Sequence, residues 1–140
     1  MLILDSIKEL LSKKSSVQMV ADDPHMASEI LLLVRMMFAD GELSSEELIL
    51  FKKICKSFFS IPEEDVPEVI RFLKDFGYET SGEQAAATFL DMPEERKRVL
   101  MRHLITMARA DQTLHETEVS LIARVARVLG FTPAQVRKGM

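Results

Sequence analysis

Four acidic residues occupy matching places in two similar stretches of the sequence. Asp40 and Glu47 flank the first stretch, and Asp111 and Glu118 flank the second. Clustered carboxylates suit hard cations such as Ca²⁺, Mg²⁺ or Mn²⁺ better than copper or structural zinc. The four acids are therefore the candidate metal ligands of this chain.

Structural roles are also open to the same acids. Ser44 and Glu47 have the spacing of a capping box, in which the glutamate binds the backbone N–H of the serine. In the second stretch His115, a poor helix cap, stands where the first has Ser44. Asp40 and Asp111 follow helices, where a negative charge opposes the helix dipole by about 0.3–1 kcal/mol. Each aspartate can offset that cost by accepting hydrogen bonds from N–H groups of its own turn. Capping and cation binding are thus alternative explanations of the same residues.

The first acidic stretch lacks the pattern of an EF-hand. Counting from Asp40, the sixth residue is Ser45, where that loop requires Gly, and the twelfth is Phe51, where it requires Glu. If one ion is shared by all four acids, the two stretches must lie close together in space.

Residue types used in nucleophilic catalysis are scattered along the chain. His25, His103 and His115 form neither a metalloprotease motif nor a triad spacing, and the sequence has no Gly-rich phosphate loop. Cys55, the single cysteine, falls on an apolar helical stripe and is expected to be a buried thiol without thiolate character. We therefore expect a protein that is not an enzyme. The alternative is a metal-dependent enzyme that uses the four acids.

The elements that must position these acids are helical. Apolar residues recur at helical spacing and no stretch alternates with the period of a strand, which predicts an all-α fold. Predicted helices over 26–39 and 45–58 flank the first acidic stretch, and helices over 94–110 and 116–129 flank the second. Residues 13–23 are polar without a strong period and are predicted to form a loop. Shorter helices are predicted over 2–12 and 83–90, on either side of Pro67, and after Thr132.

Apolar stripes on these helices predict the core. The 26–39 helix is apolar nearly all round, as expected of a helix in the centre of a bundle. The helices that follow the acidic stretches each carry one apolar stripe that should face the core. The stripes consist of Leu48, Phe51, Ile54, Cys55 and Phe58 in the first helix, and Val119, Ile122, Val125, Ala126 and Leu129 in the second. We expect Leu48, Phe51, Ile54, Ile122, Val125 and Leu129 to be largely buried.

An internal repeat organises the chain. The stretch Ala39–Glu47 aligns with Ala110–Glu118 at a constant offset of 71 residues, and the apolar pattern continues to match beyond it. A helical hairpin cannot bury its apolar stripe alone, so two hairpins should pack against each other. We therefore predict a compact bundle of seven to eight helices built from two pseudo-symmetric helical-hairpin repeats. The expected single domain comprises an N-terminal helix and loop (1–25), a first repeat (26–77), and a linking helix with a second repeat (78–140).

Charge and hydropathy constrain location and partners. The net charge is −4, but residues 94–140 carry nine bases against five acids. The late bases Arg124, Arg127, Arg137 and Lys138 are not interleaved with aromatic residues, so nucleic-acid binding is a weak alternative. The sequence shows no signal peptide and no apolar run long enough to span a membrane. We expect a soluble, cytoplasmic protein.

One short run of residues resembles a known family. The run from Ala39 to Ser44, followed by Glu47 and preceded by an apolar helix, is similar to the signature of TerB-like domains. Such domains occur in tellurite-resistance proteins and beside J-domains in membrane-anchored co-chaperones. The resemblance covers roughly residues 26–139, although Gln112 and His115 depart from the signature in the second repeat. It implies an all-helical fold and a stress-linked, metal-related role without a known reaction.

The function hypothesis combines these observations. We expect a non-enzymatic stress-response module that binds a protein partner, with or without a divalent cation on the acidic turn residues. A homodimer is one form that the partner could take. The alternatives are the metal-dependent enzyme and the weak nucleic-acid binder described above.

Overall fold

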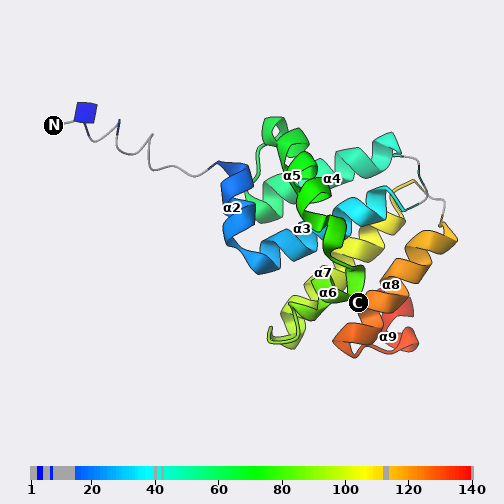
Figure 1. The fold of residues 1–140 in the computed structure, drawn as a ribbon. Helices are drawn as coiled ribbons and strands as arrows, with labels where there is room; N and C mark the ends of the chain where they lie inside the picture. Colours follow the sequence, from blue (N-terminus) through cyan, green and yellow to red (C-terminus); the bar gives the residue numbers. More distant parts are fainter. Residues whose placement is uncertain are drawn as a thin grey trace.

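The structure is a computed structural model that describes residues 3, 4, 7, 15–39, 41, 43–111 and 114–139. These residues form helices and turns, with no strand among them, which confirms the predicted all-α fold (Figure 1). The α-helices are α2 (Ser16–Asp22), α3 (Pro24–Met37), α4 (Ser45–Phe59), α5 (Val66–Phe76), α6 (Gly82–Ala87), α7 (Glu94–Ala108), α8 (Glu116–Leu129) and α9 (Pro133–Arg137). Short 3₁₀ helices, η1 (Glu63–Asp65) and η2 (Gly77–Glu79), precede and follow α5.

Helix α3 lies at the centre of the bundle. It contacts α2, α4, α5, α6 and α7. Ile30, Leu32, Leu33, Met36 and Met37 of this helix have no exposed surface. A helix that is apolar on every face is stable in water only when other elements surround it, and this one is surrounded as predicted.

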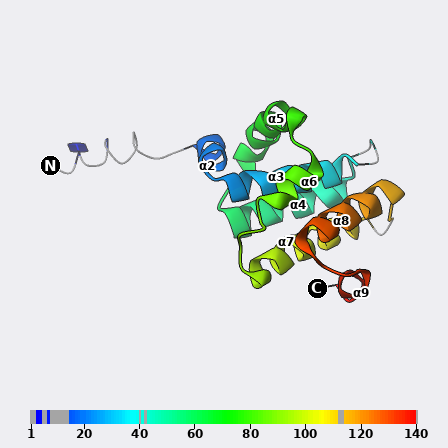
Figure 2. The ribbon, with the colours of Figure 1, turned by 60° about the horizontal axis from the view of Figure 1, so that its bottom comes forward.

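The helix boundaries repeat along the chain with the predicted offset. Helix α3 ends at Met37 and α7 at Ala108, while α4 begins at Ser45 and α8 at Glu116, so both boundaries recur after 71 residues. The two turns that join these helices lie at the same end of the molecule in both views (Figures 1 and 2). The chain is therefore built around two helical hairpins of matching size.

The predicted loop over 13–23 is wrong, because residues 16–22 form α2. Ser15 caps this helix, with its Oγ accepting a hydrogen bond from the Gln18 N–H at 3.1 Å. Val20 is fully buried, and the Ser16 hydroxyl donates to Asp65 at 2.7 Å. A helix this short is marginal in isolation. Its packing against α3 and α5 supplies the stability that the local sequence lacks.

Three side chains of the predicted stripes are less buried than expected. Phe58 is 43% exposed, Val119 is 46% exposed, and Leu48 is only partly buried. At the end of α4 it is Phe59, not Phe58, that enters the core, because the buried face advances from Phe51 in helical steps to the later residue. The remaining predicted core positions are confirmed, with Phe51, Ile54, Ile122, Val125 and Leu129 no more than 8% exposed.

The predicted helix over 2–12 lies mostly outside the described residues. Ile3, Leu4 and Ile7, which belong to its apolar stripe, are 76%, 56% and 47% exposed. These three side chains therefore do not dock on the bundle. Within the described ranges, every helix is too short or too polar to cross a lipid bilayer.

Candidate functional site at the paired helix turns

Glu47 is held at the beginning of α4. Its side chain is only 2% exposed, although it is a carboxylate in the first turn of a surface helix. The Ser44 hydroxyl donates to Glu47 Oε1 at 3.0 Å, and the Glu47 N–H donates back to Ser44 Oγ at 3.1 Å. Ser44 is thus the N-cap that the sequence predicts, and Glu47 is tied to it through the serine side chain.

Glu118 occupies the equivalent place at the beginning of α8 and is also 2% exposed. Its Oε1 accepts the backbone N–H of His115 at 3.3 Å, and the His115 Nε2 lies 4.0 Å from the same oxygen. The helix therefore begins after His115, despite the poor capping propensity of histidine. The glutamate supplies the backbone half of the capping box here.

The aspartates of the two stretches are less defined by their surroundings. Asp111 follows α7 and is partly buried, whereas Asp40 lies outside the described residues. Among the residues that are described, no three His, Cys, Asp or Glu side chains gather closely enough to hold an ion. Because that search leaves out Asp40, the four-acid site remains a prediction.

A buried ionic cluster that the sequence analysis missed joins α3 to α7. Glu29 has no exposed surface, and its two carboxylate oxygens bind different partners. Arg96 Nη2 forms an ion pair with Oε1, and His103 Nδ1 lies 2.6 Å from Oε2. The Arg96 guanidinium also lies over two aromatic rings, 5.0 Å from the centre of Phe58 and 5.2 Å from that of Phe89.

One signal in the sequence could have revealed this cluster. Glu29 is a single acid in a segment that is otherwise apolar on every face, and an acid buried in a central helix requires a cationic partner. The partners themselves were not predictable, because Arg96 and His103 lie about 70 residues further along the chain. The cluster connects the first helices of the two hairpins and does not contact the acidic turns.

Two groups in the bundle have a pKa displaced by burial. Burial raises the pKa of the Cys55 thiol to about 12, which confirms the expected absence of thiolate character. Burial also lowers the pKa of Arg35, and the nearby positive charge of Arg124 lowers it further. The Arg35 guanidinium donates to the Gly77 carbonyl at 2.6 Å and so anchors the end of α5 to α3.

A groove opens beside the first turn, between α4 and α5. We call it the first groove; its volume is about 420 Å³. Phe38, Leu43, Leu48 and Ile70 contribute apolar surface. The bases are Lys52, Arg71 and Lys74, and no acidic residue is among the described residues that line the groove.

Exposed leucines mark both turns. Leu43 in the first turn is 41% exposed and Leu114 in the second is 61% exposed. The two positions are equivalent, since they are separated by the repeat offset of 71 residues. The turns lie at one end of the bundle, so that end presents two leucines to solvent, one of them at the edge of the first groove (Figure 2).

Comparison with known proteins supports the resemblance noted in the sequence. Residues 26–139 match the family model described as tellurite resistance protein TerB, a span that includes both hairpins and both turns. No curated protein and no solved structure shows significant similarity to the chain. The match supports a role in tellurite resistance. On the strength of a family match over nearly its whole length, the chain belongs to the TerB family.

Proposed function

We propose that this chain acts in tellurite resistance as a non-enzymatic module that binds a protein partner through the end of the bundle where the two turns lie. The observation that carries the proposal is the pair of exposed leucines, Leu43 and Leu114, at equivalent positions of the two turns. An apolar side chain exposed once is ordinary, but its recurrence at the same point of both repeats calls for a reason.

The surroundings of the first turn favour binding over bond-making chemistry. The first groove combines apolar side chains with the three bases Lys52, Arg71 and Lys74. Such a surface can hold a partner by hydrophobic contact and opposite charge, which are the two components of a typical protein interface. No nucleophile or general base is among the described residues of its lining.

Survival on tellurite tests the proposal directly. We would compare cells that carry the wild-type chain with cells that carry Leu43→Ser together with Leu114→Ser, and expect the variant to lose protection. Leu90→Ser is the matched control, because Leu90 is similarly exposed, at 53%, but lies after α6 and away from the turns. Circular dichroism should show that both variants keep the helical content of the wild type. Full protection by the double variant would contradict the proposal.

A divalent cation on the turn acids is a second candidate. The observation in its favour is that two carboxylates, Glu47 and Glu118, are each 2% exposed at equivalent places. If a cation is bound, Ca²⁺, Mg²⁺ or Mn²⁺ should raise the melting temperature of the wild-type chain by mass action. A metal-dependent enzyme built on the same acids would require this result first.

A further inference from the structure

The surface between α8 and α9 contains another groove, which we call the second groove. Its volume is about 360 Å³. Val119, Ile122, Ala126, Phe131 and Val136 supply its apolar surface. None of the described residues that line it is acidic. An apolar groove on the surface of a chain that carries net negative charge is a candidate docking site.

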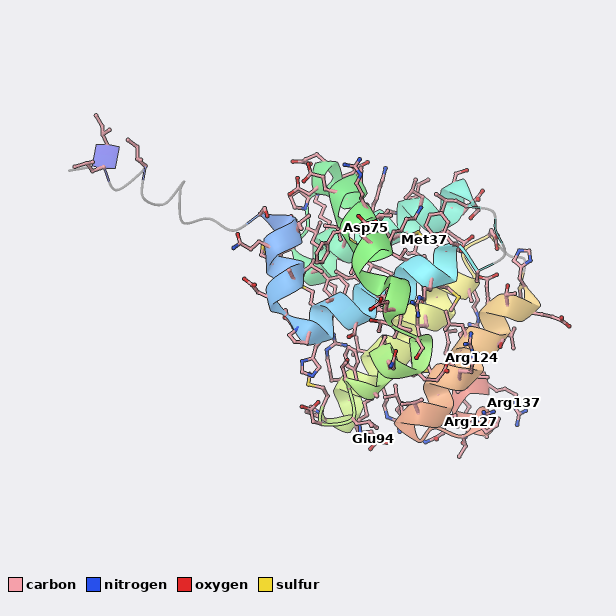
Figure 3. The ribbon with its side chains drawn as sticks, in the orientation of Figure 1. Met37, Asp75, Glu94, Arg124, Arg127 and Arg137 are labelled. Atoms are coloured by element: carbon pink, nitrogen blue, oxygen red, sulfur yellow. The ribbon has the colours of Figure 1, made fainter. Side chains whose placement is uncertain are left out.

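Two arginines form a basic rim on this groove. Arg127 of α8 and Arg137 of α9 both belong to its lining. Neither forms an ion pair with a carboxylate of the described part of the chain. Their neighbour Arg124, shown beside them in Figure 3, is instead bound to Glu83 at 3.2 Å. The two rim arginines therefore keep their charge available to a ligand.

The first and second grooves occupy equivalent places in the two repeats. Leu48 and Val119 correspond at the offset of 71, and each lies in its own groove. The bases, however, come from positions that do not correspond, since Lys52 in the first groove is matched by Ala123 in the second. An inherited repeat would explain shared positions. It does not explain the same charge reached from different positions, which indicates a shared requirement for an anionic ligand.

We propose that the second groove binds an acidic amphipathic helix of a partner protein. Its α8 wall runs from Val119 to Arg127, which is about 12 Å at 1.5 Å per residue. Apolar anchors at positions i and i+7 of a docked helix lie about 10.5 Å apart, so two turns of such a helix match the wall. Acidic residues beside the anchors would face Arg127 and Arg137. This inference rests on the proposed function, because it names the class of partner.

Charge disfavours a second copy of this chain as the occupant. Its most apolar free segment, residues 1–14, carries Asp5 and Glu9 against Lys8, Lys13 and Lys14, so its side chains have a net positive charge. A positively charged helix does not complement a basic rim. An acidic helix complements both the apolar floor and the rim of the second groove.

A defined peptide tests the proposal on the full chain. We would synthesise an amphipathic peptide with leucines at i, i+3, i+4 and i+7 and glutamates beside them, and a control in which lysines replace the glutamates. Isothermal titration should show that the glutamate peptide binds at least tenfold more tightly and that added salt weakens its binding. Equal affinity for the two peptides, or no binding of the glutamate peptide, would overturn the proposal.

Two variants locate the binding. Arg127→Glu with Arg137→Glu should weaken binding of the glutamate peptide at least tenfold. The matched control is Lys56→Glu with Lys53→Glu, because Lys56 is the repeat equivalent of Arg127 and both lysines are exposed outside the grooves. A second test fills the groove: Ala123→Phe should abolish binding, whereas Ala87→Phe, at an exposed alanine of α6, should not. Wild-type affinity in Ala123→Phe would overturn the assignment of the site.

The remaining occupants are separated by two measurements. Binding of phosphatidylglycerol vesicles but not of the glutamate peptide, with loss in Ala123→Phe, would replace the proposal with a lipid site. A dimer in sedimentation that Ala123→Phe dissociates, without peptide binding, would replace it with self-association. The survival experiment with Leu43 and Leu114 is independent of the second groove. Peptide binding combined with full survival of that variant would therefore reject the proposed function and leave the groove assignment in place.

Discussion

The two hairpins have the same helix boundaries but different interiors. Helix α3 is buried nearly all round, whereas α7 has an exposed face that carries Arg98 and Arg102 in surface ion pairs. The clearest difference is at Glu29, whose repeat equivalent is Leu100, a fully buried apolar residue. The backbone of the hairpin therefore tolerates either a charge or a leucine at this position. What the position requires is a matching partner.

The ends of the second helices also differ. Helix α4 ends at Ser60 in the left-handed region, with φ of 58°, whereas α8 ends at Gly130, with φ of 84°. The Ile61 N–H bonds the Cys55 carbonyl at 2.9 Å, and the Phe131 N–H bonds the Ala126 carbonyl at 2.9 Å. The first bond spans one residue more than the second. The single-residue difference between the repeats is thus absorbed at the end of α4, where it leaves the rest of the hairpin in register.

The largest expected effect concerns the buried charge in the first hairpin. Glu29→Ala should lower the free energy of unfolding by about 3–5 kcal/mol, because it leaves Arg96 and His103 without their carboxylate. Urea denaturation measures this loss. The control is Glu94→Ala, which removes an exposed ion pair with Arg98 and should cost about 0.2–1 kcal/mol.

Removing both charges would sharpen the same comparison. Glu29→Leu with Arg96→Met makes the first hairpin resemble the second at this position and should cost less than Glu29→Ala alone. If the double substitution is as damaging as the single one, the cluster does more than satisfy a buried charge.

A second difference, Cys55 against its equivalent Ala126, predicts a pH dependence. The folded pKa of Cys55 is about 12, raised from 9.0, so burial opposes the thiolate. Stability from the protonated thiol is complete below pH 9 and is lost as the pH rises from 9 towards 12. At pH 10 the wild type should have lost about 1.4 kcal/mol more than Cys55→Ala, relative to pH 7. Parallel urea midpoints for the two proteins across this range would contradict the prediction.

The caps provide a third comparison, which also tests the cation. If the acids only shape their turns, Glu47→Gln and Glu118→Gln should each cost about 0.5–2 kcal/mol whether or not Ca²⁺, Mg²⁺ or Mn²⁺ is present. If the acids share an ion, the cation should stabilise the wild type, and Asp40→Asn and Asp111→Asn should each abolish that effect without adding to each other. Thermal melts with and without each cation distinguish the two results.

The smallest expected effect is at the helix ends. Ser60→Gly should raise the free energy of unfolding by about 0.5–1 kcal/mol, because glycine adopts a positive φ without steric cost. Gly130→Ala should lower it by about 1 kcal/mol for the same reason. Thermal melts of the two variants should shift in opposite directions, and shifts in the same direction would show that the two helix ends are not equivalent.

Local sequence patterns were sufficient for most of the fold. The apolar periods, the Ser44 cap and the constant offset predicted the long helices to within a few residues. They failed for α2, whose stability comes from Val20 and Ser16 packing on other helices. Local patterns also could not choose between Phe58 and Phe59, because neighbouring residues on a helix differ by only 100° in direction and the partner helix decides which one is buried.

The sequence by itself determined the class of fold, the repeat, the family resemblance and the four acids of the turns. These follow from short-range spacing, since helix periodicity and capping involve residues only a few positions apart. Only the tertiary structure decided which charge is buried, which turn residues are exposed, and that two grooves with basic linings lie at equivalent places. Each of these depends on residues brought together from distant parts of the chain, as with Glu29 and His103, and no local spacing encodes such a pairing.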